Sequence, residues 1–119
     1  MIRTELEQIK AVLSAIDGVT LVSTTWPASM DTLPAIIIRL AGESAADQRD
    51  DSEYLTRMQW YVHVFAPKEK ALMDISSLAH KAMEGIGYTR TLRWDDHTDG
   101  AAQVVFRFSK TMVTQLHDI

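Results

Sequence analysis

The stretch EYLTRMQWYVHVFAPKEKALMDISSLAHKAMEGI, residues 53–86, decides the fold of this chain. In its first part, residues 54–66, apolar side chains alternate with polar or mixed ones. The apolar side chains of that alternation are Met58, Trp60, Val62 and Val64, and the polar or mixed ones are Arg57, Gln59, Tyr61 and His63. A period of two predicts a long β-strand with one apolar face and one mixed face.

A helix is predicted directly after this strand. Pro67 suits the first turn of a helix, because proline has no backbone N–H and its φ angle is preset. Apolar residues then recur every three or four positions, and they are Leu72, Ile75, Leu78, Ala79, Ala82, Met83 and Ile86. That spacing gives the helix one apolar face. A helix that folds back onto its preceding strand is the seed of a two-layer α+β domain.

The flanking sequence supplies the remaining elements. An apolar stripe predicts a helix over residues 3–17, and residues 20–24 predict a short strand at a sheet edge. Further strands are predicted over residues 35–41, 88–94 and 101–113. The order is therefore α-β-β-β-α-β-β. We expect an α+β fold, with two helices packed on one face of a mostly antiparallel sheet of four to five strands.

Length and composition are those of one soluble globular domain. The 119 residues are 46% hydrophobic and 24% charged, so residues 1–119 are predicted to form a single domain, with residues 114–119 as a frayed tail. The chain has no cysteine, which excludes disulfides, thiolate catalysis and cysteine-ligated zinc. We expect no secretory signal and no membrane partner, since no apolar run approaches the ~20 residues that span a bilayer. The net charge of −4 disfavours specific binding of nucleic acid.

Two polar segments are predicted to be loops. Residues 42–51, GESAADQRDD, are acidic in balance and lack aromatic and β-branched residues. They form either a disordered connector or a loop that orders on assembly, and the charged members proposed as contacts are Glu43, Asp47, Arg49, Asp50 and Asp51. Residues 25–33 form the other loop. Trp26 in it either covers an edge of the core or faces a partner.

The closest approach to a metal site is the segment 95–100. It contains Asp95, Asp96, His97 and Asp99, but it lacks the distal glutamate of a calcium loop. Because residues of this type also form turns before a glycine, we interpret the segment as a turn and predict no metal.

Catalytic signatures are missing from the sequence. His63 could act as a general base, but its strand neighbours include no acid or nucleophile to partner it. There is no glycine-rich phosphate loop, nucleophile elbow or zinc-binding His-Glu-x-x-His pattern. We therefore predict no catalytic residue and no cofactor.

The mixed face of the sheet is the more informative feature. Its polar members are predicted to be Arg39, Arg57, Gln59, Tyr61, His63, Gln103 and Arg107. Tyrosine and arginine are enriched where proteins meet, so this face is a candidate interaction surface. It could equally be an ordinary solvated face. RNA binding on the sheet is disfavoured, because the charge is wrong and the stacked aromatic pair of that mode is missing.

In their order, these features resemble the small tail-completion proteins of long-tailed phages and prophages, the tail-terminator and tail-to-head joining group. The resemblance covers nearly the whole chain. It rests on the N-terminal helix, LPAIII at 33–38, RMQWYVHVFA at 57–66, a helix with Ala71, Ile75, Leu78, Ala79 and Met83, and the closing strand pair around Asp99 and Gly100. The weak first strand and the acidic segment 42–51 depart from the family pattern.

This resemblance implies a structural, non-enzymatic protein located in the virion tail after assembly in the host cytoplasm. Members of the group form rings, usually hexamers, that end the tail tube and help to join tail to head. The implied partners are further copies of the chain, the major tail tube protein and head-completion or connector proteins. DNA would pass through the ring without specific binding. The alternative is a small cytosolic α+β enzyme or ligand-binding domain, with a site near His63 or the turn at 95–99.

Overall fold

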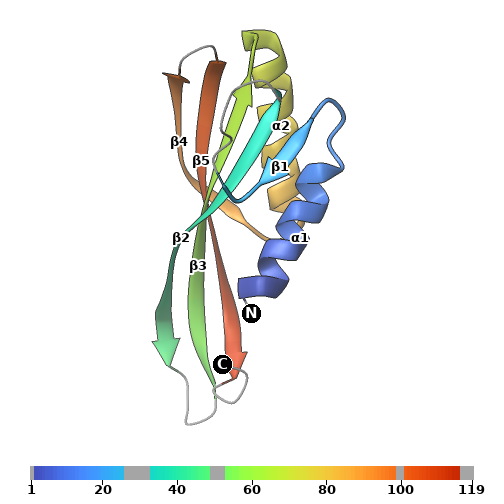
Figure 1. The fold of residues 1–119 in the computed structure, drawn as a ribbon. Coiled ribbons are helices and arrows are strands. Elements are labelled where there is room, and N and C mark those ends of the chain that lie inside the picture. The colour runs from blue at the N-terminus through green and yellow to red at the C-terminus, as the bar shows by residue number, and fades with distance from the viewer. Residues whose placement is uncertain (1, 26–32, 49–52, 99–100, 116–119) are drawn as a thin grey trace.

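A computed structural model describes the backbone of residues 2–25, 33–48, 53–98 and 101–115, and the side chains of 2–25, 33–43, 55–96 and 102–112. The elements are α1 (Ile2–Ser14), β1 (Leu21–Ser23), β2 (Ala35–Gln48), β3 (Glu53–Ala66), α2 (Glu69–Gly85), β4 (Thr89–Thr98) and β5 (Ala101–Gln115). The predicted order α-β-β-β-α-β-β and the α+β class are confirmed (Figure 1).

The sheet has five strands in the order β1-β2-β3-β5-β4. The short β1 runs parallel to β2, and every other pair of neighbours is antiparallel. Both helices lie on the same side of this sheet (Figure 1), which leaves the other side open. None of the described helices is long and apolar enough to cross a membrane.

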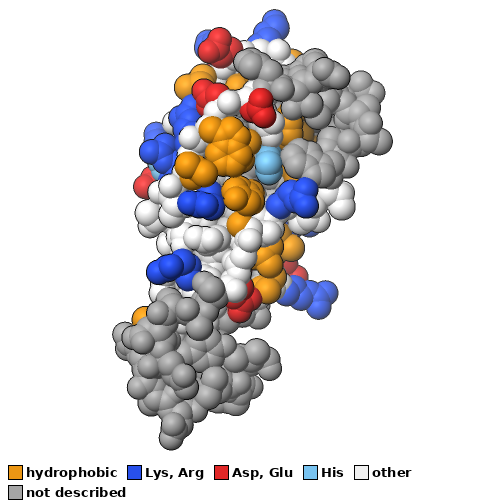
Figure 2. Space-filling model, turned by 90° about the vertical axis from the view of Figure 1, so that its left-hand side faces the viewer, with side chains coloured by type: hydrophobic (Ala, Val, Ile, Leu, Met, Phe, Trp, Pro, Cys, Tyr) orange, Lys and Arg blue, Asp and Glu red, His pale blue; other side chains and the backbone are white. Residues whose placement is uncertain are grey.

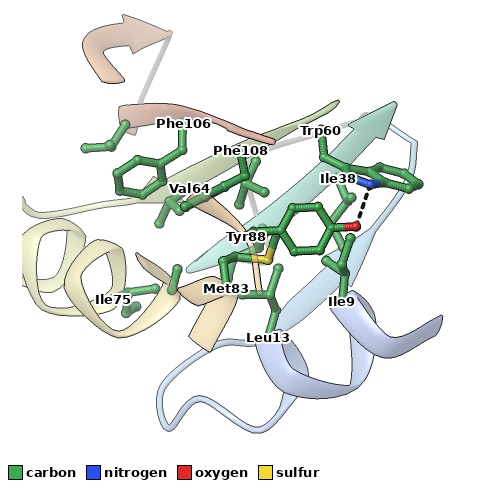
Figure 3. Close-up of a cluster of buried hydrophobic side chains, with 14 of the residues drawn as sticks. Ile9, Leu13, Ile38, Trp60, Val64, Ile75, Met83, Tyr88, Phe106 and Phe108 are labelled. Carbon is green, nitrogen blue, oxygen red and sulfur yellow. Dashed lines mark hydrogen bonds between the residues drawn. The ribbon is translucent and has the colours of Figure 1, made fainter. Parts of the chain in front are cut away.

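The core lies between the helices and the predicted apolar face of β3. Met58, Trp60, Val62 and Val64 are all buried there, as the alternation predicted. β5 adds Val104, Phe106 and Phe108 to the same face (Figure 3), and the rings of Phe106 and Phe108 lie 5.3 Å apart. Ile9 and Leu13 of α1 and the apolar stripe of α2 cover these side chains.

A buried polar chain connects the first helix to the last strand. Trp60 Nε1 donates to the Tyr88 hydroxyl at 3.1 Å, and that hydroxyl donates to Glu5 Oε1 at 2.9 Å (Figure 3 shows the first bond). Lys110 Nζ donates to the same carboxylate oxygen at 3.0 Å. Burial, followed by the adjacent Glu5 carboxylate, raises the pKa of Tyr88 far above its usual value. The tyrosine therefore stays neutral and holds the chain of hydrogen bonds together.

The prediction that residues 42–51 form a loop is wrong for 42–48, which belong to β2. There β2 pairs residue by residue with β3 as far as Gln48↔Tyr54. Antiparallel pairing satisfies backbone groups whatever the side chains are, so a polar composition does not prevent it. Two register shifts, at Ala41 and Ala46, mark bulges in this strand. Residues 49–52 lie outside the described part of the chain.

The prediction of a turn at 95–100 is also wrong for its first four residues. β4 continues through 95–98, where it pairs with β5 as far as Thr98↔Ala101. Residues 99–100 are not described. Residues typical of turns thus form a strand here, because pairing with the long β5 on one side is enough to stabilise an edge strand.

The sequence predicts that Tyr88, Leu92 and Trp94 share one side of the strand at 88–94, and this prediction is wrong. Tyr88 is 2% exposed on the helix side, whereas Leu92 and Trp94 are 41% and 39% exposed on the opposite side. A register shift between Arg90 and Leu92 leaves Thr91 as an extra residue. A bulge of this kind inverts the alternation, so side chains that should share a face are separated.

The element boundaries differ from the prediction by a few residues. The first helix ends at Ser14 and not at residue 17, and β5 runs to Gln115, into the tail expected to fray. In α2 the N-cap is Lys68, so Pro67 precedes the helix. Frayed ends and caps of this kind are the least predictable part of an element.

The molecule is elongated, with extents of 51 × 23 × 22 Å. The lower halves of β2, β3 and β5 continue past the N-terminal end of α1 (Figure 1). We call this three-stranded extension, residues 42–48, 53–59 and 109–115, the arm.

Candidate interaction surface

The open face of the sheet gathers the predicted polar residues into rows across the strands. The register Arg39↔Tyr61↔Arg107 puts one side chain from each of β2, β3 and β5 side by side. Directly opposed side chains in a sheet lie about 5 Å apart at Cβ, within reach of each other. Gln59 and Arg57 occupy the next two open-face positions of β3 towards the arm.

Aromatic rings run along the same face. The Tyr61 ring lies 6.2 Å from that of His63 and 6.1 Å from the indole of Trp94, which it meets edge-on. His63 in turn stacks on Phe65, with ring centroids 6.3 Å apart and planes inclined by 11°. Edge-on and offset arrangements are those that aromatic quadrupoles favour. The four side chains therefore form a continuous aromatic row, and Trp94 was missed from the sequence because the bulge at Thr91 was not foreseen.

A hollow of about 410 Å³ opens beside this row. Its lining consists of Arg39, Leu40, Ala41, Tyr61, His63 and Trp94. Figure 2 shows hydrophobic side chains at the centre of this face, with a histidine beside them and Lys or Arg side chains on both sides. Leu40, Leu92 and Trp94 are each about two-fifths exposed, so part of each large apolar side chain is accessible.

Arginine on this face is held by the sheet itself. Arg107 Nε donates to Thr91 Oγ1 at 2.9 Å, and that hydroxyl donates to the Arg107 carbonyl oxygen at 3.2 Å. The bulged residue thus fixes the direction of the guanidinium. A positioned arginine beside Tyr and Trp has the composition of a protein-binding hot spot.

His63 is held in place by a hydrogen bond to a neighbouring strand. Its Nδ1 lies 2.8 Å from Oε1 of Gln103, a side chain that is itself only 6% exposed. Burial, and to a smaller degree the positive charge of Arg39, lower the pKa of His63, although the bond to Gln103 opposes this. The described residues that line the hollow include no carboxylate and no hydroxyl or thiol nucleophile beyond the phenol of Tyr61. The arrangement suits recognition of an apolar or anionic group.

The lowered pKa of His63 gives an expected pH dependence. The unfolded chain binds a proton near the ordinary value of 6.5 and the folded chain only at lower pH, so stability is complete above 6.5 and falls as pH drops below it. We expect His63→Gln to lose less melting temperature than the parent between pH 7.5 and pH 5, as measured by circular dichroism. Equal losses in the two proteins would show that His63 is solvated.

At the end away from the arm, the open face is closed by a small apolar cluster. Ile37 and Phe65 are almost completely buried on the open side and pack with Leu33. The solvated-face alternative is therefore incorrect at this end of the sheet. The accessible part begins at His63 and runs towards the arm.

Only some of the other proposed contact residues are described by the structure. Trp26, Arg49, Asp50 and Asp51 lie outside the described residues, and the side chain of Asp47 is not described. Glu43 is exposed, but its register partner is Met58, so it lies on the helix side of the sheet and not with Arg39. The structure brings together Arg39, Tyr61, His63 and Arg107 and separates Glu43 from them.

Of the residues considered for a metal site, the side chains of Asp95 and Asp96 are described, and those of His97 and Asp99 are not. Asp95 Oδ1 lies 3.6 Å from Arg93 Nε, an ion pair along the strand. Adjacent strand residues point to opposite faces, which directs Asp95 and Asp96 apart. Among the side chains that are described, no three His, Asp or Glu residues are placed to hold a metal ion.

Comparison with solved structures gives an informative likeness. No protein-family profile matches the chain, and no curated protein matches its sequence. The fold is similar to that of a chain in a solved structure of the virion of a native gene transfer agent particle. The two share 14% sequence identity with a TM-score of 0.53, over 92% of this chain and 91% of that one. At this identity the likeness shows a common fold.

Proposed function

We propose that this chain is a structural, non-catalytic virion protein that completes the phage tail tube and helps to join tail to head, acting as a ring of identical copies. The observation that carries the proposal is the fold shared, over nearly the full length of both chains, with a component of a gene transfer agent virion. Residues 33–38, 57–66 and α2 supply the sequence pattern typical of tail-completion proteins.

The open face supports this role physically. A ring of identical subunits needs a heterologous interface, in which one patch meets a different patch of the next copy. The hollow beside Tyr61 and Trp94 has the aromatic and arginine content of such a patch. The arm offers a second, separate contact region.

The alternative, a small enzyme or ligand-binding domain, has one favourable observation. His63 does line a hollow, as that hypothesis requires. The described residues that line the hollow, however, offer it no carboxylate, and the only hydroxyl among them is the phenol of Tyr61. We favour a protein partner over a small molecule for this surface.

Deletion of the gene from the phage or prophage that encodes it tests the proposal. We expect particles whose tails have lost a defined length or have failed to join heads, seen by negative-stain electron microscopy, with normal particles restored by a plasmid copy. Tails of normal length on filled heads after deletion would reject the proposed function.

Sedimentation velocity of the purified protein supplies the matching biophysical measurement. A concentration-dependent assembly of one defined size is expected, weakened by Trp94→Ala because the indole is exposed on the open face. Lys10→Ala on the exposed side of α1 serves as the matched surface control. An equal effect of both substitutions would remove the open face from the interface.

A further inference from the structure

The arm has two sheet edges that the described residues of this chain leave uncovered. β1 pairs with β2 only at residues 35–37, and β4 pairs with β5 only as far as residue 109. Beyond those points, residues 38–48 of β2 and 110–115 of β5 each have β3 as their single partner strand. Every second residue on such an edge directs its backbone N–H and C=O groups outwards, where another strand can bind them.

The two edges of the body are protected in ways that the β5 edge of the arm is not. On one side β1 covers the start of β2. On the other, β4 carries a bulge at Thr91 and the charged residues Arg90, Arg93, Asp95 and Asp96, which are typical of edges that avoid pairing. In β5, residues 110–115 keep an unbroken register with β3, and Lys110 is their only charged residue. This segment is a regular edge, and no strand among the described residues pairs with its outer side.

We infer that the arm joins copies of the chain by strand addition, with residues 110–115 of β5 pairing with the outer edge of β2, around residues 42–45, of a second copy. The inference rests on the proposed ring and names the contact that closes it. The occupant is a second copy because the two open edges lie on opposite sides of one arm, so each copy can both offer and accept a strand.

The strand directions determine how this junction pairs. β2 and β5 are both antiparallel to β3, so they run in the same direction. Where the sheet of one copy continues into that of the next, β5 therefore pairs with β2 of its neighbour in parallel. Repetition around a ring closes the arms into a barrel, and closure removes every free edge. The bulges at Ala41 and Ala46 bend β2, as a sheet that curls into a barrel requires.

Cysteine cross-linking tests the junction, because the chain has no cysteine of its own. Thr111 pairs with Arg57 and Gly42 with Gln59, so both lie on the open face of the arm, whereas Glu43 lies on the opposite face. A Cβ added at Gly42 meets nothing within 4 Å, so the substitution fits. The full-length double variant Gly42→Cys/Thr111→Cys is treated with a short bis-maleimide at the concentration where sedimentation detects the assembly.

We expect a ladder of covalent multimers on a denaturing gel. The control Glu43→Cys/Thr111→Cys should give about tenfold less product, since alternate strand residues face opposite sides. The two single variants should stay monomeric.

The other outcomes each reject the inference in a distinguishable way. Covalent dimers from Thr111→Cys alone would indicate that two β5 edges pair with each other. A defined assembly without a ladder would place the ring interface elsewhere and leave the proposed function intact. A monomer at every concentration would reject both the strand addition and the proposed ring.

Discussion

Replacing Trp60 with alanine should lower the free energy of unfolding by about 3–5 kcal/mol, the usual cost of deleting a large aromatic side chain from a core. The indole is 2% exposed and packs between the helices and the sheet (Figure 3). Its Nε1 also donates to the Tyr88 hydroxyl, which would lose one of its partners. Guanidinium unfolding followed by circular dichroism measures the change.

Trp94→Ala is the matched control for this substitution. It removes the same side chain from the same sheet, but from the open face, where the indole is 39% exposed and meets Tyr61 edge-on. We expect a loss of about 1 kcal/mol or less from it, since an exposed aromatic pair contributes little more. Losses of similar size from the two variants would mean that the helices do not cover the face assigned to them.

Replacing Glu5 with glutamine should cost about 2–3 kcal/mol, because it leaves the Lys110 ammonium without its carboxylate in a largely buried site. The side chains of Glu5 and Lys110 are 12% and 22% exposed, and their contact joins residues 105 positions apart. Lys110→Met removes the charge and keeps the aliphatic stem. The double variant Glu5→Gln/Lys110→Met should therefore be more stable than the sum of the single losses predicts.

A double-mutant cycle in urea measures this coupling, and additive losses would contradict it. Tyr88→Phe gives an independent readout through pH. A tyrosine whose pKa is raised on folding contributes stability that is complete below the ordinary value of 10.0 and is lost as pH rises above it. Between pH 9 and pH 11 the parent should thus lose more melting temperature than Tyr88→Phe.

The two predictions bear on function because they separate the scaffold from the surface. Trp60, Tyr88 and Glu5 hold α1 against the sheet, whereas Trp94 and Arg107 lie on the face left open. Variants of the first group should destabilise the subunit. Variants of the second should leave it folded and change only its association.

Much of the fold was predictable because it depends on local periodicity. The alternation around Trp60 and Val62 fixed which face of β3 is buried, and the three-to-four spacing in 69–85 fixed the face of α2. These patterns are predictive because the free energy gained by burying a side chain depends on its own apolar area. It does not depend on which residues pack against it. The open-face positions of Arg39, Tyr61 and Arg107 followed from the same alternation.

The candidate site was predictable only in part. Trp94 joined Tyr61 through a bulge at Thr91, and Gln103 met His63 across a strand pair that no local pattern specifies. Glu5, Tyr88 and Lys110 came together from the first helix, the position before β4 and the last strand. Bulges and cross-strand partners depend on register between distant segments, which residue types alone do not encode.

By itself, then, the sequence determined which residues must leave water: the stripe on each helix and one face of each long strand. Tertiary structure alone decided the length of the strands. Segments 42–48 and 95–98 have the composition of loops, yet each lies beside a partner strand. The N–H and C=O groups of that strand form hydrogen bonds with the backbone of the segment whatever its side chains are. The pattern of apolar side chains predicts which residues are buried. Backbone pairing depends instead on which strand is the neighbour, and only the folded chain specifies that.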